Sequence, residues 1–199
     1  MNVAPLVLQL PKGRVCLEPL GPQHAAGIVA AAPPEETWRL MPAPRPTTVA
    51  AAQEIIDKAL AGQKAGTDLP FAVIDRLSGT LAGSTRYLDI QPGNRNLEIG
   101  WTWYAEAFQR TSINTECKLL LMTHAFETLG CVRVQLKTDG RNTRSQAAIT
   151  RLGAVREGTL RKTRVCHDGY IRDTVYFSVL DSEWPAVKAR LEGLLAKAR

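Results

Sequence analysis

The sequence has no apolar run long enough to cross a membrane. A transmembrane helix needs about 20 consecutive, predominantly apolar residues, and no run in these 199 residues approaches that length. The short run from Leu6 to Leu10 has no basic segment before it, so it is not typical of a signal peptide. We therefore expect a protein of the cytoplasm that has no membrane partner.

Cysteine and histidine are also scarce and scattered. The four cysteines and three histidines form no Cys-x-x-Cys pair and show no spacing typical of zinc ligands. In a cytosolic protein, isolated cysteines are more often small buried apolar residues than disulfides or metal ligands. We expect no metal site. The residues concerned are Cys16, Cys117, Cys131, Cys166, His24, His124 and His167.

Composition and charge are those of a globular protein with a basic C-terminal part. Apolar residues make up 45% of the chain, and the length suits a single α/β domain over residues 1–199. The net charge of +6 is uneven, since residues 131–199 hold 14 Lys and Arg against 7 Asp and Glu. A phosphorylated cofactor, a nucleic acid or simply a solvated basic face would each account for this excess.

The spacing of apolar residues alternates between the periods of strands and helices. Strands are expected over 14–20, 71–75, 81–90, 97–104, 132–137, 154–164 and 173–180, and helices over 22–32, 114–129 and 142–152, with two more helices capped by Thr47 or Thr48 and by Ser182. Gly130 and Gly153 fit the left-handed position that follows a helix. The strands from 71 to 104 form an antiparallel meander, whereas 97–137 is a parallel crossover. This order predicts an α/β (α+β) fold with a mixed, mostly antiparallel sheet and helices on both faces.

The polar segment 109–114 lies between a predicted strand and the start of a predicted helix. The first backbone N–H groups of a helix have no partner within the helix, and the helix dipole favours an anion there. A pyrophosphate would fit this place, and Arg110 adds a positive charge. A polar loop that only caps the helix is the alternative.

Around this loop, the chain resembles the GNAT superfamily of N-acetyltransferases, and within it the Rim branch that acetylates the N-termini of ribosomal proteins. The family's phosphate loop reads Gln/Arg-x-x-Gly-x-Gly/Ala. Gln109 matches its first position, whereas Ser112 and Asn114 stand in place of the two small residues. The resemblance runs in family order over residues 14–185, through the segments Leu97–Trp101, Ala125–Glu127, Lys137–Asp139, Arg141–Ser145, Arg151–Ala154, Asp168-Gly169 and Arg172-Asp173.

The resemblance implies that acetyl-CoA lies between two splayed central strands, 97–104 and 132–137. It implies that backbone groups near Thr102 and Tyr104 bond the acetyl and pantetheine amides, that Asn142 bonds the pantetheine arm and that Arg144 lies near the nucleotide. The pyrophosphate is expected on the loop after Gln109, at the backbone N–H groups of Arg110, Thr111, Ser112, Ile113, Asn114 and Thr115. Glycine permits close backbone approach to a ligand, so Ser112 and Asn114 place the phosphates further out.

Transfer of an acyl group to nitrogen requires a neutral amine, a polarised carbonyl and a proton for the leaving thiolate. A peptide α-amine has a pKa of about 7.7–8.0 and needs only mild help from a base, whereas a lysine of pKa about 10.4 needs more. Glu98 is the candidate base, on a strand face that we expect it to share with Gly100 and Thr102. Its alternative role is a structural ion pair with an arginine. Ser145 is the candidate proton donor, with helix capping as its alternative role, and Tyr176 is a reserve acid.

Three other functions remain open at this stage. The acceptor is either the N-terminal α-amine of a peptide or a small amine such as an antibiotic or a polyamine, although no acidic cluster suited to a polyamine is evident. The replaced glycines also suit a non-catalytic acyl-CoA-binding module. Nucleic-acid binding is disfavoured, because no known motif and no interleaved basic and aromatic stripe is present. A homodimer is expected from the resemblance alone.

Overall fold

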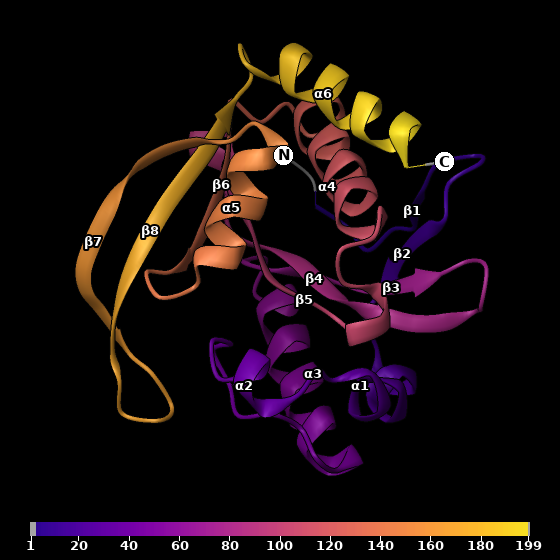
Figure 1. Cartoon of the computed structure of the whole chain (residues 1–199), viewed down its shortest axis with the longest axis vertical. Coiled ribbons are helices and arrows are strands. Elements are labelled where there is room, and N and C mark those ends of the chain that lie inside the picture. Colours follow the sequence, from indigo (N-terminus) through magenta and orange to yellow (C-terminus); the bar gives the residue numbers. More distant parts are fainter. Residues whose placement is uncertain (1–2, 199) are drawn as a thin grey trace.

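The computed structural model describes residues 3–198, which form one eight-stranded sheet with helices on both faces (Figure 1). The strand order is β1-β2-β3-β4-β5-β6-β8-β7, and all neighbours are antiparallel except β5 and β6. The strands are β1 (Leu8–Gln9), β2 (Val15–Pro19), β3 (Leu69–Asp75), β4 (Thr80–Gln91), β5 (Asn96–Tyr104), β6 (Arg133–Asp139), β7 (Val155–Val165) and β8 (Ile171–Leu180). The predicted fold class and the parallel crossover are confirmed.

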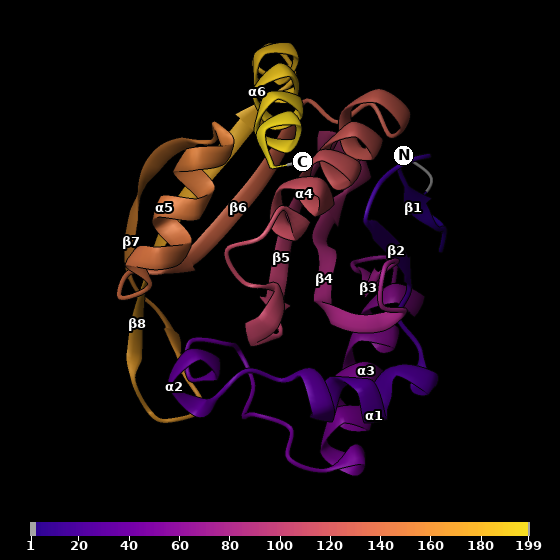
Figure 2. The ribbon, with the colours of Figure 1, turned by 45° about the vertical axis from the view of Figure 1, so that its right-hand side comes forward.

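Two helical layers bury opposite faces of this sheet (Figures 1 and 2). One layer holds α1 (Ala25–Ala31), α2 (Glu35–Trp38) and α3 (Val49–Lys64), and the other holds α4 (Ile113–Thr123), α5 (Thr143–Leu152) and α6 (Trp184–Lys197). Each layer has its own buried apolar cluster. Ile56 of α3 and Trp38 of α2 belong to the first cluster, and Leu121 of α4 and Leu191 of α6 belong to the second.

Several helix ends lie where the sequence predicts them. The Thr48 side chain accepts a hydrogen bond from the N–H of Ala51 and caps α3. Gly130 and Gly153 adopt φ values of +66° and +106°, the left-handed conformation that glycine adopts without steric cost. Asn142, and not Ser145, caps α5: the Asn142 Oδ1 accepts a hydrogen bond from the backbone N–H of Ser145.

Other boundaries were predicted wrongly. Ser182 does not cap α6, because Glu183 occupies the cap position and Pro185 stands in the first turn. The short helix α2 lies inside the proline-rich segment 33–46, where no helix or strand was predicted, and the two-residue strand β1 is too short to leave an alternating pattern. The helix expected over 114–129 is α-helical only as far as Thr123 and ends in a π-helical turn over His124–Thr128.

The parallel pair at the centre of the sheet is joined over only three residue pairs. Asn96, Leu97 and Glu98 of β5 pair with residues 133–135 of β6, and beyond Glu98 no further pairs form although both strands continue. Figures 1 and 2 show the two strands diverging in the direction of α2. The central strands are therefore splayed.

A β-bulge in β5 changes which residues share a face. Gly100 pairs with Arg86 and Trp103 pairs with Ser84, so two residues of β5, Trp101 and Thr102, oppose one residue of β4. Trp101 has a φ of +50°. Glu98 lies on the α1–α3 face, because its strand neighbours belong to the core beneath α4, whereas Thr102 contacts a side chain of α4. The prediction that Glu98 and Thr102 share a face is therefore wrong, since the bulge reverses the alternation between them.

Candidate functional site

A cavity of about 850 Å³ occupies the place where β5 and β6 diverge. Its walls come from both diverging strands, the segment 108–111, α4, the whole length of α5 and the segment 33–42 around α2. Arg164 and Arg172 of the β7–β8 hairpin complete it. The cavity therefore reaches from the α4–α5 face of the sheet to the opposite face.

The loop before α4 is held by its own side chains. The Gln109 Nε2 donates to the carbonyl oxygen of Tyr104 at 3.0 Å, and Arg144 of α5 donates to the Gln109 Oε1 at 2.7 Å. The Thr111 hydroxyl donates to the carbonyl oxygen of Phe108 at 2.7 Å. The left-handed residue of the loop is Arg110, with φ +59°, whereas Ser112 has φ −69°. The backbone conformation at 112 therefore does not require glycine.

The first turn of α4 has free amide groups beside the cavity, although only Asn114 of this turn lines it and Ser112, Ile113 and Thr115 do not. The backbone N–H groups of Asn114 and Thr115 have no acceptor among residues 3–198, and Ser112 makes no capping hydrogen bond with its side chain. The Asn114 Oδ1 accepts a hydrogen bond from the Tyr104 hydroxyl at 3.2 Å. Free amides at a helix N-terminus beside Arg110 and Arg144 fit a pyrophosphate.

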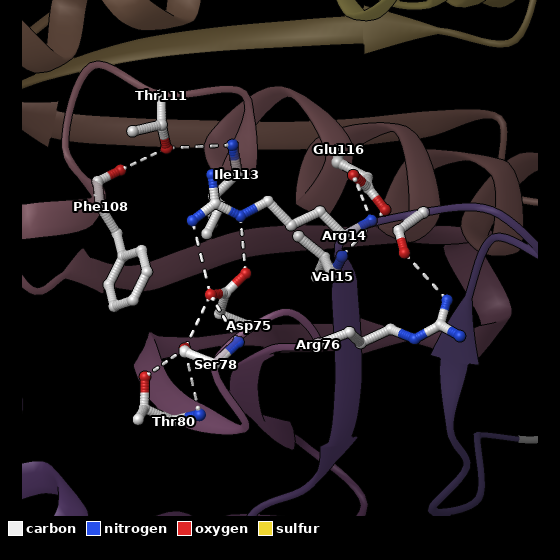
Figure 3. Close-up of polar contacts among 11 residues, drawn as sticks. Arg14, Val15, Asp75, Arg76, Ser78, Thr80, Phe108, Thr111, Ile113 and Glu116 are labelled. Carbon is white, nitrogen blue, oxygen red and sulfur yellow. Dashed lines mark hydrogen bonds and ion pairs between the residues drawn. The ribbon is translucent and has the colours of Figure 1, made fainter. Parts of the chain in front are cut away.

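The position of α4 is fixed by a buried carboxylate in its first turn (Figure 3). Glu116 accepts hydrogen bonds from the backbone N–H groups of Arg14 and Val15, at 3.1 and 3.0 Å. The Arg14 guanidinium in turn pairs with Asp75 of β3 at 2.6 Å and lies over the Phe108 ring (Figure 3). These contacts tie the loop and the helix start to β2 and β3, so the amides are held in place before any ligand binds.

Glu98 lies at the fork itself and is 2% exposed. Its Oε2 accepts hydrogen bonds from Gln135 Nε2 at 2.8 Å and from Lys137 Nζ at 2.9 Å. Burial raises the pKa of this carboxyl, and the Lys137 charge partly opposes the rise. The structural partner of Glu98 is therefore a lysine of the neighbouring strand and not the expected arginine.

Ser145 and Asn142 line the opposite wall of the cavity, at the start of α5. Because Asn142 caps the helix, the Ser145 side chain is not needed for capping, and its hydroxyl has no hydrogen-bond partner within residues 3–198. Thr102 and Tyr104 also line the cavity. Tyr176, the reserve acid, does not.

Lys118 is a cavity residue that sequence reasoning missed. It is 4% exposed, its Nζ donates to the Thr102 hydroxyl at 3.1 Å, and it has no ion pair among the residues that the structure describes. Burial lowers the pKa of Lys118 to about 8. The sequence does contain a signal for this role. Lys118 lies four residues after Asn114 inside an otherwise apolar run, and such a spacing places both residues on one helix face.

Arg172 and Lys137 were also not predicted as cavity residues. They come from β8 and β6, on the same sheet face as Glu98. Within residues 3–198, no helix has both the length and the apolar character to span a membrane, and no three side chains of metal-binding type gather together.

The chain matches the family model of the acetyltransferase (GNAT) domain over residues 14–155. The resemblance deduced from the loop is thereby confirmed: the chain belongs to the GNAT family of acetyltransferases. The fold supports this membership. A crystal structure of a GCN5-related N-acetyltransferase from Brucella melitensis superposes with a TM-score of 0.88 at 34% identity, covering 96% of this chain and 86% of that one.

Two more relatives are informative. A crystal structure of a "putative acetyltransferase" from T. thermophilus is 38% identical with a TM-score of 0.88, covering 98% of this chain and 100% of that one. A protein of Bacillus subtilis (strain 168) named "Putative ribosomal N-acetyltransferase YdaF" is 34% identical over 110 residues. That match spans 55% of this chain and 59% of the relative's length.

Proposed function

We propose that this protein transfers the acetyl group of acetyl-CoA to a primary amine, the α-amine at the N-terminus of a peptide or protein. The observation that carries the proposal is the cavity at the fork of β5 and β6. It joins the free amides at the start of α4 to the buried carboxylate of Glu98 on the other face. Membership of the GNAT family and the ribosomal name of the relative from Bacillus subtilis support it.

Acetyl-CoA supplies an acyl group activated as a thioester, and the residues present suit its binding. The backbone N–H groups from Arg110 to Thr115 would hold the pyrophosphate, with Gln109 and Arg144 bracing the loop from the side. Thr102, Tyr104 and Asn142 line the path from the loop to the fork and would contact the pantetheine arm. Ser145 stands on the wall opposite Thr102 and would lie near the sulfur.

The proposed chemistry assigns one task to each polar group at the fork. Glu98 takes the proton of the attacking amine, directly or through water. The Lys118 ammonium, placed beside Thr102, stabilises the negative charge that develops on the carbonyl oxygen. The Ser145 hydroxyl gives a proton to the leaving thiolate. Together these groups provide the neutral amine, the polarised carbonyl and the protonated thiol that the reaction requires.

The cavity wall favours a peptide over a polyamine or an aminoglycoside. Among residues 3–198, three acidic side chains line it, Glu36, Glu98 and Asp139, and the last two are already paired with Lys137 and Arg141. A polycationic acceptor would need several unpaired carboxylates. The cytoplasmic location and the homodimer stay predictions that rest on the lack of a membrane span and on the resemblance.

Acetyl-CoA should stabilise the protein against heat. A ligand that binds only the folded state raises stability by about 2.7 kcal/mol at 100 times its Kd, so the melting temperature should rise with ligand concentration in a thermal-shift titration. Ser112→Gly should leave the midpoint of this titration within about twofold, because position 112 does not depend on its side chain for backbone conformation or capping. Ser182→Gly, outside the cavity, is the matched control.

Two results would contradict these expectations. The absence of any shift at millimolar acetyl-CoA would refute binding at this cavity. A loss of affinity in Ser112→Gly but not in Ser182→Gly would show that the serine hydroxyl contacts phosphate.

Peptides with free N-termini should be the best acceptors. The assay measures release of free thiol from acetyl-CoA with N-terminal peptides, peptides whose only amine is a lysine, polyamines and aminoglycosides. Peptides with a free α-amine should exceed the lysine peptides at pH 7, because a far larger fraction of an α-amine is neutral there. Turnover confined to polyamines or aminoglycosides would rule out the proposed acceptor.

A further inference from the structure

Arg172 is a buried cation without a partner in the described part of the chain. Its side chain is 7% exposed and lines the cavity on the Glu98 face. Its Nε is one of three buried side-chain nitrogen or oxygen atoms within residues 3–198 that have no hydrogen-bond partner, and its guanidinium forms no ion pair there. Buried guanidinium groups are normally hydrogen-bonded, so this arrangement indicates that something else completes the site.

The carboxylates on this side of the cavity are held by other cations. Asp139 accepts bonds from Arg141 Nε at 3.0 Å and from Arg141 Nη2 at 2.8 Å, and Glu98 is paired with Lys137. Burial lowers the pKa of Arg172 despite the attraction of Asp139 and Glu98. The cavity therefore holds a desolvated positive charge that its own carboxylates do not balance.

The strand pattern explains why this arginine points into the cavity. Val175, Phe177 and Val179 of β8 belong to the core beneath α5 and α6, so Arg172 lies on the opposite face by alternation. Arg164, opposite Arg172 on β7, donates to the carbonyl oxygen of Pro42 at 3.3 Å. This contact draws the hairpin over the segment around α2, and both lie side by side in Figures 1 and 2. Arg172 therefore lines the cavity where the hairpin meets the segment around α2.

The Glu98 side of the cavity has one more basic residue than acidic residues. On the Glu98 side, four basic residues line the wall against three acidic ones, namely Lys137, Arg141, Arg164 and Arg172 against Glu36, Glu98 and Asp139. Of the remaining basic residues of the cavity, Arg110 and Arg144 lie at the loop assigned to the phosphates, Lys118 lies beside Thr102, and Arg151 is on α5. An anion that enters the acceptor side would therefore meet an unpaired guanidinium.

We infer that the acceptor carries a carboxylate close to its reacting amine and that Arg172 binds this carboxylate. The inference rests on the proposed function and names the class of its acceptor. A guanidinium presents two parallel N–H groups that match a carboxylate, and such a charge-assisted pair discriminates strongly against a neutral analogue. The carboxylate comes either from an Asp or Glu side chain at the start of a peptide or from the α-carboxylate of a free amino acid.

The test compares acceptors in matched pairs. One set contains short peptides with Glu or Gln, and Asp or Asn, at each of the first three positions, and the other contains free amino acids and their amides. In the thiol-release assay, the carboxylate member of at least one pair should have a kcat/KM about 10- to 100-fold higher, the factor expected for a hydrogen bond to a charged group. The set in which the preference occurs identifies the source of the carboxylate.

Variants show whether Arg172 causes the preference. Arg172→Gln should reduce the difference within the pair to about one, chiefly through KM, and Arg172→Lys should retain part of it because the charge remains. Arg161→Gln removes the same charge from an exposed position on the same hairpin and should keep the preference. A preference that persists in Arg172→Gln would overturn the inference, and so would a wild-type enzyme that acetylates both members of every pair equally.

A binding experiment distinguishes failure of this inference from failure of the proposed function. With CoA present, thermal shifts are measured for N-acetylated products and their neutral amides, namely N-acetylglycine and its amide and acetylated Glu and Gln peptides. A carboxylate-dependent shift that Arg172→Gln removes supports the inference even if no amine in the panel is acetylated, in which case only the proposed activity fails. If no pair differs in either turnover or binding, the inference is wrong.

Discussion

Lys118→Met is expected to make the protein more stable and less active. The lysine is buried and has no ion pair with any residue that the structure describes, and burial lowers its pKa from 10.5 to about 8. A shift of one pKa unit corresponds to 1.36 kcal/mol, so burial of the protonated form costs about 3 kcal/mol. Methionine has a similar length and no charge, and the variant should therefore unfold at higher denaturant concentration at pH 7.

The pH dependence of this gain has a definite sign. Below about pH 8, the lysine is protonated in both the folded and the unfolded state, and the whole cost is present. Between about pH 8 and 10.5, the folded state has released the proton while the unfolded state keeps it, so wild-type stability rises with pH. The advantage of Lys118→Met should therefore be largest at neutral pH and should disappear near pH 10.5.

Lys137→Met provides the matched control, since it makes the same substitution at the same cavity. It removes the partner of the buried Glu98 carboxylate, so it should destabilise the protein. Turnover of Lys118→Met should fall by about 100- to 1,000-fold, the usual loss when one donor to a developing oxyanion is removed. A variant that is stabilised yet fully active would remove Lys118 from the chemistry, and a variant destabilised like Lys137→Met would refute the buried unpaired charge.

Turnover of Glu98→Gln is expected to fall by about 100- to 10,000-fold near pH 7, the usual contribution of a general base. The loss should be greatest at low pH, where little amine is neutral, and raising the pH should recover part of the rate because solution then deprotonates the amine. Burial raises the pKa of Glu98, so its ionised form is disfavoured in the folded state and the substitution should not unfold the protein. Lys137 is partly exposed, and water can solvate it once the carboxylate is gone.

Ser145→Ala should give a smaller loss, which also diminishes as the pH rises. A thiol has a pKa of about 8.5, so protonation of the leaving thiolate matters less as the pH rises. The cap of α5 should survive, because it uses only the backbone N–H of residue 145. The measurement is a pH–rate profile of both variants at saturating acetyl-CoA. If both profiles coincide with the wild type, neither residue takes part, and positioning would drive the reaction.

Local patterns were sufficient to predict most of the fold. Alternation marked β5 and β6, and Gly130 and Gly153 marked helix ends because only a few residue types adopt their dihedral angles readily. The position of the polar loop before α4 follows from the change of period alone. The splay of the central strands and the residues along the cofactor path came from the family resemblance.

What failed depends on contacts between distant segments. The bulge at Trp101 places a bulky residue in a left-handed conformation, which no local propensity favours, and it moved Thr102 to the other face. The partner of Glu98 stands 39 positions later in the chain, on a neighbouring strand. Arg172 is unusual because its buried Nε has no hydrogen-bond partner and its guanidinium no ion pair within residues 3–198. This can be recognised only once the surrounding side chains have been placed.

The short junction between β5 and β6 divides the sheet into two leaves of unequal size. One leaf holds five strands and the other three, and only three residue pairs join them at one end. Because so few residue pairs join the two parts of the sheet, the angle between them depends on what is bound between β5 and β6. A long, thin cosubstrate bound there would fix this angle. The molecule that supplies the acyl group would then also order the strands that line the acceptor side of the cavity.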